Sequence, residues 1–133
     1  MSRATNVELF HRVTAALNRG DVEYAVRHST EDVVVIAARS AVEGRFVGHE
    51  GLRKFFADNA TNFEVFQTRY DDVRDLGEDR VLAIGTIHIR GRGAGVEMDV
   101  PVAGIATYRE GKLCRWEDFR ERRAAFEAAG LAE

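Results

Sequence analysis

The sequence has a single cysteine, Cys114, and a single proline among its 133 residues. One cysteine excludes an internal disulfide framework and any zinc or iron–sulfur site that needs several thiolates. One proline and twelve glycines leave no proline-rich or glycine-rich linker of the kind that separates domains. We therefore expect the chain to fold throughout, as one domain over residues 1–133.

Long apolar runs and an excess of basic charge are missing as well. No uninterrupted apolar stretch approaches the roughly 18 residues of a membrane span, and no signal-peptide core is present. Nineteen Lys and Arg against twenty-two Asp and Glu give a net charge of −3 with both signs interspersed, so no basic surface is available for phosphate backbones. We expect a soluble cytoplasmic protein with neither nucleic acid nor a membrane as its partner.

Helical periodicity marks three segments of the N-terminal half. Apolar residues recur at three- and four-residue spacing across residues 9–17, which predicts a helix that ends at Gly20. Asp21 is a typical N-cap for a second, short helix. A third helix is predicted to begin at Gly48. One stripe of this helix carries Leu52, Phe55, Phe56 and Asn59, and its aromatic bulk suggests that it closes over something large.

Strand patterns dominate the rest of the chain. A continuous β-branched run is typical of a strand buried on both faces, and the apolar period changes to two after residue 62. Turn residues separate the later segments. The predicted strands are Val33–Ala38, Glu43–Val47, Glu64–Val73, Arg80–Arg90, Val96–Arg109 and Lys112–Phe119, followed by a short terminal helix over Arg120–Ala129.

This order of elements predicts an α+β fold. The three N-terminal helices are expected to roof one face of a curved antiparallel sheet, which gives the sheet the shape of a cone. Neither layer alone fills the wide end of a cone with side chains. We therefore expect a pocket for a small, mostly apolar ligand.

Three motifs, in this order along the chain, resemble one known family. They are AALNRGD over Ala15–Asp21, FVGHEGL over Phe46–Leu52 and YREGKLCRWEDF over Tyr108–Phe119. Together they resemble a SnoaL-like domain of the nuclear-transport-factor-2-like superfamily, over nearly the whole chain. The resemblance implies a cystatin-like α+β cone, usually a homodimer formed through the outer sheet face. It leaves the function open, because such domains include polyketide cyclases, ketosteroid isomerases, epoxide hydrolases, dehydratases and proteins without catalytic activity.

The last strand holds the main candidate for chemistry. Strict alternation places Cys114, Trp116 and Asp118 on one face of it. The Trp-x-Asp-aromatic pattern over residues 116–119 resembles the strand from which limonene-epoxide-hydrolase-like members point an acid into their pocket, which implies a catalytic acid or base at Asp118. A carboxyl group beside Trp116 is poorly solvated, so its pKa is expected to rise toward neutral pH. The alternative is a salt bridge between Asp118 and a nearby arginine.

His88 is the second catalytic candidate, and its role depends on which face of its strand lines the cone. Alternation groups it with Leu82, Ile84, Thr86 and Arg90, and leaves an apolar set on the other face. If this group faces inward, Asp118 orients the imidazole of His88 and His88 moves the proton. If it faces outward, His88 lies at an interface. Both remain open, because a dimer-forming sheet buries residues on both of its faces.

Residues that differ from those of the named enzymes narrow the range of reactions that the resemblance implies. The positions that match the three ketosteroid isomerase residues hold Val13, Ala37 and Gly104, which disfavours that mechanism. The arginine and aspartate pair of limonene-epoxide hydrolases is also missing. The matching strand positions hold Gly85 and Ile87, or Thr86 and His88 if the alignment shifts by one residue.

The preferred interpretation is a cofactor-independent acid–base enzyme that acts on a mostly apolar small molecule as an isomerase, cyclase, hydratase or hydrolase. The alternative is a non-catalytic ligand-binding module or dimeric interaction module. The expected catalytic residues are Asp118 and His88, and the expected substrate contacts are Phe55, Arg90, Val100, Val102 and Trp116. No metal site is predicted, because the four histidines are scattered over separate elements.

Overall fold

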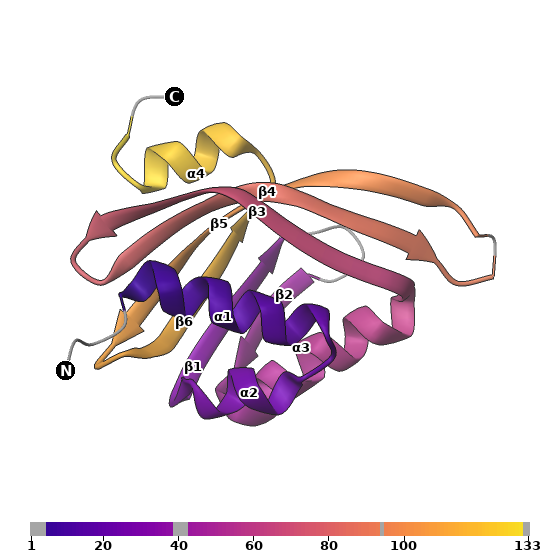
Figure 1. Ribbon diagram of the computed structural model, residues 1–133, viewed down its shortest axis with the longest axis horizontal. Helices are drawn as coiled ribbons and strands as arrows, with labels where there is room; N and C mark the ends of the chain where they lie inside the picture. The colour runs from indigo at the N-terminus through magenta and orange to yellow at the C-terminus, as the bar shows by residue number, and fades with distance from the viewer. Residues whose placement is uncertain (1–4, 39–42, 94, 132–133) are drawn as a thin grey trace.

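The computed structural model describes residues 5–38, 43–93 and 95–131. Helices and strands follow one another in the predicted order and with nearly the predicted bounds (Figure 1). In chain order they are α1 (Asn6–Asn18), α2 (Val22–Arg27), β1 (Ser29–Ala38), β2 (Glu43–Val47), α3 (Gly48–Asn62), β3 (Phe63–Gly77), β4 (Arg80–Gly91), β5 (Glu97–Arg109), β6 (Lys112–Phe119) and α4 (Arg122–Ala128).

Local signals account for the junction between α1 and α2. Gly20 follows α1 with a φ of 82°, a conformation that glycine adopts without strain. Asp21 then caps α2, because its Oδ1 accepts a hydrogen bond of 3.2 Å from the backbone N–H of Tyr24. The chain therefore turns sharply enough for both helices to lie on the same face of the sheet.

The six strands form one curved sheet in the order β2-β1-β6-β5-β4-β3. Strands β3 to β6 are an antiparallel meander, as predicted, and β1 pairs antiparallel with β2. Strand β1 is parallel to β6, whereas the sequence predicted a sheet of antiparallel strands. This pairing brings the last strand to the middle of the sheet, where both of its neighbours shield it from water.

Helices cover both faces of the sheet. Helices α1, α2 and α3 lie on one face, called the inner face here, and α4 lies across the opposite, outer face (Figure 1). Each face has its own apolar cluster. The inner cluster includes Phe10, Leu52, Phe55, Val81, Ala83, Ala106 and Tyr108, and the outer cluster consists of Leu82, Ile84, Ala103, Ile105, Ala125, Phe126 and Ala129, with Leu76 and Phe119 packed against it.

The two clusters settle which residues of β4 face inward. Val81 and Ala83 pack in the inner cluster, whereas Leu82 and Ile84 pack beneath α4. The wholly apolar set therefore faces the N-terminal helices, and the set that includes His88 faces outward. The homodimer expected through this outer face stays a prediction.

An irregularity between β3 and β4 bends the sheet. The register of the pair shifts between Tyr70 and Asp72, opposite Gly85. A Cβ atom at Gly85 would lie 2.0 Å from the backbone oxygen of Arg69, so no larger residue fits there. Glycine at this position permits the bulge, and bulges of this kind increase the local twist and curvature of a sheet.

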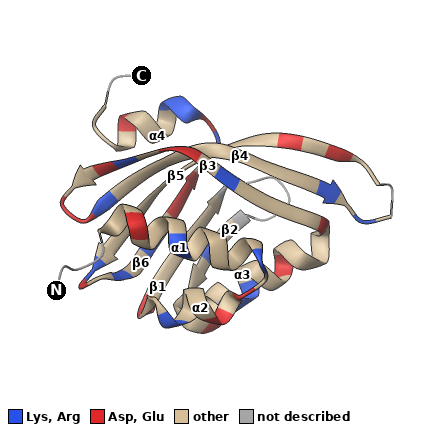
Figure 2. Cartoon of the chain, in the orientation of Figure 1, with Lys and Arg blue, Asp and Glu red and all other residues tan. Residues whose placement is uncertain are grey.

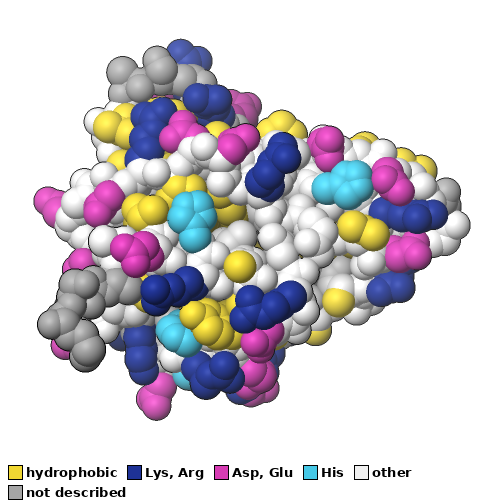
Figure 3. Space-filling model, viewed as in Figure 1, with side chains coloured by type: hydrophobic (Ala, Val, Ile, Leu, Met, Phe, Trp, Pro, Cys, Tyr) yellow, Lys and Arg dark blue, Asp and Glu magenta, His cyan; other side chains and the backbone are white. Residues whose placement is uncertain are grey.

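Charges of both signs are distributed over the described residues. Figure 2 shows Lys and Arg interspersed with Asp and Glu on helices and strands alike. On the face drawn in Figure 3, apolar side chains are exposed in small groups between charged ones. Among the helices that the structure describes, none has the length and apolar character needed to cross a membrane.

Candidate functional site

A cavity of about 110 Å³ lies between the inner face of the sheet and helices α1 to α3. Both layers contribute to its walls, as the cone predicts. Aromatic rings dominate the lining: Phe10, Phe55 and Phe56 come from the helices, and Phe66, Tyr70, Tyr108 and Trp116 come from the strands. The predicted pocket is therefore present, and its walls favour contact with an apolar or aromatic molecule.

Three of these rings form a contiguous wall. The rings of Phe10 and Trp116 stack, with centroids 5.7 Å apart and an interplanar angle of 29°. Tyr70 meets Phe10 edge to face at 4.9 Å and Trp116 at 6.0 Å. Such contacts stabilise aromatic clusters beyond the area they bury, so the three rings support one another in this wall.

The polar groups of the lining are neutral. They belong to Thr14, Asn18, Thr68, Trp116 and the two tyrosines, and no described lining residue carries a carboxylate, an imidazole, a thiol or a cationic group. Burial raises the pKa of Tyr108 well above its usual range, so its hydroxyl keeps its proton at neutral pH. The lining therefore suits an uncharged molecule.

Asp118 is buried next to Trp116, outside the cavity lining. Only 4% of its surface is exposed, and its Oδ1 accepts a hydrogen bond of 2.7 Å from Nε1 of Trp116. Asp118 is not among the residues that line the cavity. The carboxyl group that was predicted to be an acid or base thus accepts a hydrogen bond at the edge of the indole.

Gly104 makes room for the same indole. It lies opposite Asp118 on β5, and a Cβ atom there would be 2.3 Å from Cζ2 of Trp116. Trp116 is therefore fixed at its edge by Asp118 and across its face by the backbone of β5. This arrangement pre-organises one wall of the cavity.

The alternation predicted along β6 fails at Cys114. The register between β5 and β6 shifts at this point, since Thr107 pairs with Arg115 whereas Tyr108 pairs with Leu113. As a result both Leu113 and Trp116 line the cavity, although they are three residues apart. A β-bulge of this kind re-aims side chains, and here it adds Leu113 to the site.

The structure does not bring His88 and Asp118 together. Nδ1 of His88 lies 2.8 Å from Oδ1 of Asp99, and Nε2 lies 3.2 Å from Oε2 of Glu97. The hydrogen bond with Asp99, with the charges of both carboxylates, raises the pKa of His88 above its usual value. The imidazole is thus part of an exposed ion-pair cluster on the outer face, and the predicted dyad is not formed.

The remaining predicted contacts divide between the two faces. Phe55 and Trp116 line the cavity. Arg90 pairs with Glu64 at 3.5 Å and with Glu97 at 3.7 Å, outside the lining. Val100 and Val102 lie on β5 and are not among the residues that line the cavity, contrary to the prediction. Phe10, Tyr70 and Tyr108 also line the cavity but were not predicted to do so. For Tyr108 the sequence offered one signal, because alternation along β5 places it on the same face as Val102.

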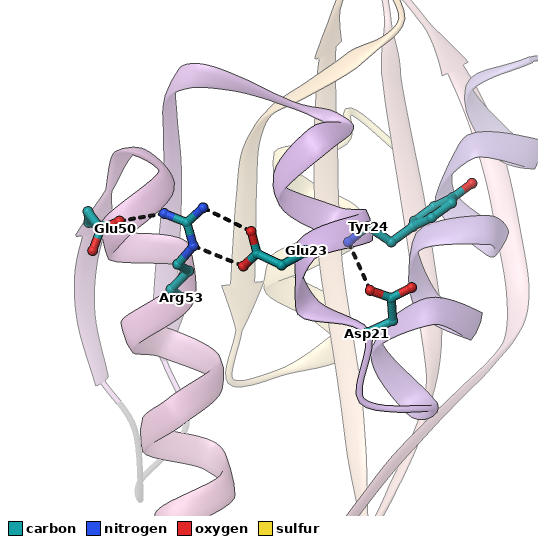
Figure 4. Close-up of polar contacts among 5 residues, drawn as sticks. All are labelled: Asp21, Glu23, Tyr24, Glu50 and Arg53. Carbon is teal, nitrogen blue, oxygen red and sulfur yellow. Dashed lines mark hydrogen bonds and ion pairs between the residues drawn. The ribbon is translucent and has the colours of Figure 1, made fainter.

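Ion pairs on the surface tie the covering helices together. Arg53 of α3 donates to Glu23 of α2 at 2.9 and 3.0 Å, and it also contacts Glu50 (Figure 4). At the end of α1, the side-chain amide of Asn18 donates to the carbonyl of Thr68 at 2.7 Å and accepts from the N–H of Thr68 at 2.9 Å. These two hydrogen bonds connect the end of α1 to the edge strand β3 at the cavity, which both residues line.

Within the described ranges, no three His, Cys, Asp or Glu side chains are placed to share a metal ion.

Comparisons with known proteins agree with this architecture. A family model described as a SnoaL-like domain matches residues 10–116. TerC co-crystallized with polyporic acid has a similar structure, with a TM-score of 0.78 and 22% identity over 94% of this chain and 98% of TerC. No curated protein sequence matches closely enough to count as a relative.

Two further solved structures share the fold. An NTF2-like protein of unknown function from Burkholderia pseudomallei K96243 has a TM-score of 0.80 and 15% identity, over 94% of this chain and 97% of its own. A protein with a ketosteroid isomerase-like fold from Catenulispora acidiphila DSM 44928, in complex with trimethylamine, has a TM-score of 0.75 and 16% identity, over 94% of each chain. At such identities the likeness establishes the fold alone.

Proposed function

Given that this chain belongs to the SnoaL-like domain family, we propose that its cavity binds a small, neutral, ring-bearing molecule. The observation that carries this proposal is the aromatic lining of a cavity of about 110 Å³. Engineered apolar cavities of about 150 Å³ stay dry and accept benzene, so a space of this order takes one ring. Burial of that ring among aromatic side chains supplies the binding free energy.

Two structural neighbours support a small-molecule role. TerC was crystallized with polyporic acid, and the Catenulispora acidiphila protein was crystallized with trimethylamine. The neutral lining of this chain favours an uncharged ligand, because burial of a charged group without a partner costs at least several kcal/mol of binding free energy.

Trp116 offers a direct test of binding, because it is the only tryptophan in the sequence and it lines the cavity. Titration with toluene is expected to change its fluorescence saturably. Val13→Phe, which adds a ring to a lining position of α1, is expected to weaken toluene binding about tenfold or more because it occupies the ligand's space. Val7→Phe, on the same helix but outside the lining, is the control. Equal affinities in the two variants, or no saturable change in the native protein, would contradict the proposal.

A second candidate function is acid–base chemistry on the bound molecule through Asp118. It is favoured by one observation: the buried carboxylate is hydrogen-bonded to a residue of the cavity wall. In this reaction Asp118 takes a proton from a carbon next to a carbonyl group and returns it to another carbon, which isomerises the substrate. The carboxyl reaches the substrate only if the indole of Trp116 turns aside.

Asp118→Asn separates the two candidates. The amide oxygen still accepts the hydrogen bond from Trp116, so toluene affinity is expected to stay within about twofold of the native value. The variant is then compared with the native protein and with Asp99→Asn, an exposed control, on a panel of small cyclic enolisable ketones and epoxides. A turnover that falls by about 10²-fold or more only in Asp118→Asn supports catalysis. Turnover that is absent in the native protein, or unchanged in the variant, removes Asp118 from any mechanism.

A further inference from the structure

Asn59 of α3 has a buried amide that makes no hydrogen bond within the described part of the chain. The residue is 3% exposed, and neither its Nδ2 nor its Oδ1 has a hydrogen-bond partner among the described residues. Nearly all buried polar groups in folded proteins are paired, because leaving them unpaired costs free energy. An amide with both its donor and its acceptor unused therefore calls for a partner.

Asn59 is not itself among the residues that line the cavity, but helical geometry places it next to three that are. Seven residues are close to two turns of an α-helix, so Asn59 has nearly the same direction as Leu52, with Phe55 and Phe56 on either side of that line. Leu52, Phe55 and Phe56 all line the cavity. Asn59 thus lies one turn beyond the two phenylalanines, at the end of the aromatic row.

Other asparagines show what a structural amide does in this fold. The Asn18 side chain uses both of its groups on the backbone of Thr68. The exposed Asn62, also on α3, donates to the carbonyl of Asp58 at 2.8 Å. Asn59 makes no such contact with the backbone of any described residue, so its amide does not stabilise the local structure as theirs do.

We propose that Asn59 recognises the polar end of the bound molecule, with Nδ2 donating to it and Oδ1 accepting from it. This inference rests on the proposed function and narrows the ligand class to neutral ring compounds that carry a hydrogen-bond donor and acceptor side by side, as a primary carboxamide does. A carboxylate supplies no donor to Oδ1, and it would bring a charge into a lining without cations.

The test compares benzamide, toluene and benzoate by the fluorescence of Trp116. In Asn59→Leu, benzamide affinity relative to toluene affinity is expected to fall about five- to tenfold, because the paired hydrogen bonds are lost while the apolar contacts remain. The unliganded variant is expected to unfold at the same or a higher temperature, since the buried amide is removed. Benzoate is expected to bind neither protein.

Asn62→Leu is the matched control on the same helix and is expected to leave the affinity ratio unchanged. Asn59→Met provides a second apolar replacement if the branched leucine does not fit. A ratio that stays at the native value in the Asn59 variants, or benzoate binding as tightly as benzamide, would overturn this inference and leave toluene binding intact. Failure of both toluene and benzamide to bind the native protein would overturn the proposed function as well.

Discussion

Gly104→Ala is expected to lower the free energy of unfolding by about 2–3 kcal/mol and to weaken ligand binding at the same time. The added Cβ would lie 2.3 Å from Cζ2 and 2.4 Å from Cη2 of Trp116, and 2.8 Å from the backbone oxygen of Glu117. These distances are well inside van der Waals contact, so the indole must move. Its movement breaks the hydrogen bond of 2.7 Å to Asp118 and displaces one wall of the cavity.

Thermal unfolding and tryptophan fluorescence measure the two consequences. The melting temperature should fall by roughly 10 °C, given the usual entropy of unfolding for a chain of this size. Gly91→Ala, near the end of β4, is the control, because a Cβ atom there meets no atom within 4 Å. A Gly104→Ala protein with native melting temperature and native toluene affinity would show that the indole does not rest on Gly104.

The helices and most strand bounds were predictable because their signals are local. The Asp21 cap and the glycine before it act within one turn of the chain, and the tight turn at Glu110 and Gly111 marks the start of β6 without reference to any distant partner. Strand β1 begins at Ser29 instead of the predicted Val33, because Ser29 already pairs with Leu113 of β6. Pairing with a strand that is distant in the sequence does not change the local hydrophobic periodicity, so the periodicity cannot predict where such a strand begins.

The face of β4 was not predictable from β4 itself. Val81, Leu82 and Ala83 are fully buried and Ile84 is nearly so, which means that both faces of this strand look equally apolar. What distinguishes them is α4, a separate element that covers Leu82 and Ile84. The dyad of His88 and Asp118 failed for this reason, since it needed the opposite choice of face.

The sequence predicted the location of the candidate site better than it predicted the roles of individual residues there. Alternation and the aromatic stripe of α3 brought Trp116 and Phe55 to the cavity. They could not show that Asp118 would face the edge of the indole, because that depends on how Trp116 leans across Gly104. Asn59 was visible on the α3 stripe, but only burial without a hydrogen bond distinguishes it from an ordinary surface amide.

Phe126→Ala is expected to lower the free energy of unfolding by about 3 kcal/mol or more. Phe126 is 2% exposed and belongs to the outer cluster with Leu82, Ile84 and Ile105. The guanidinium groups of Arg74 and Arg122 each lie 5.2 Å from its ring centroid. Because α4 spans only seven residues, it depends on this anchor to stay on the sheet.

Ligand affinity is expected to change little in Phe126→Ala, because the cavity lies on the other face of the sheet. Phe56→Ala is the matched comparison, since it removes the same side chain from the cavity lining. It should weaken toluene binding strongly and cost less stability, because Phe56 is only partly buried. Chemical denaturation and fluorescence titration of both variants provide the measurement. A Phe126→Ala protein that loses affinity as much as Phe56→Ala would show that α4 supports the cavity through the sheet, so that the two faces do not act independently.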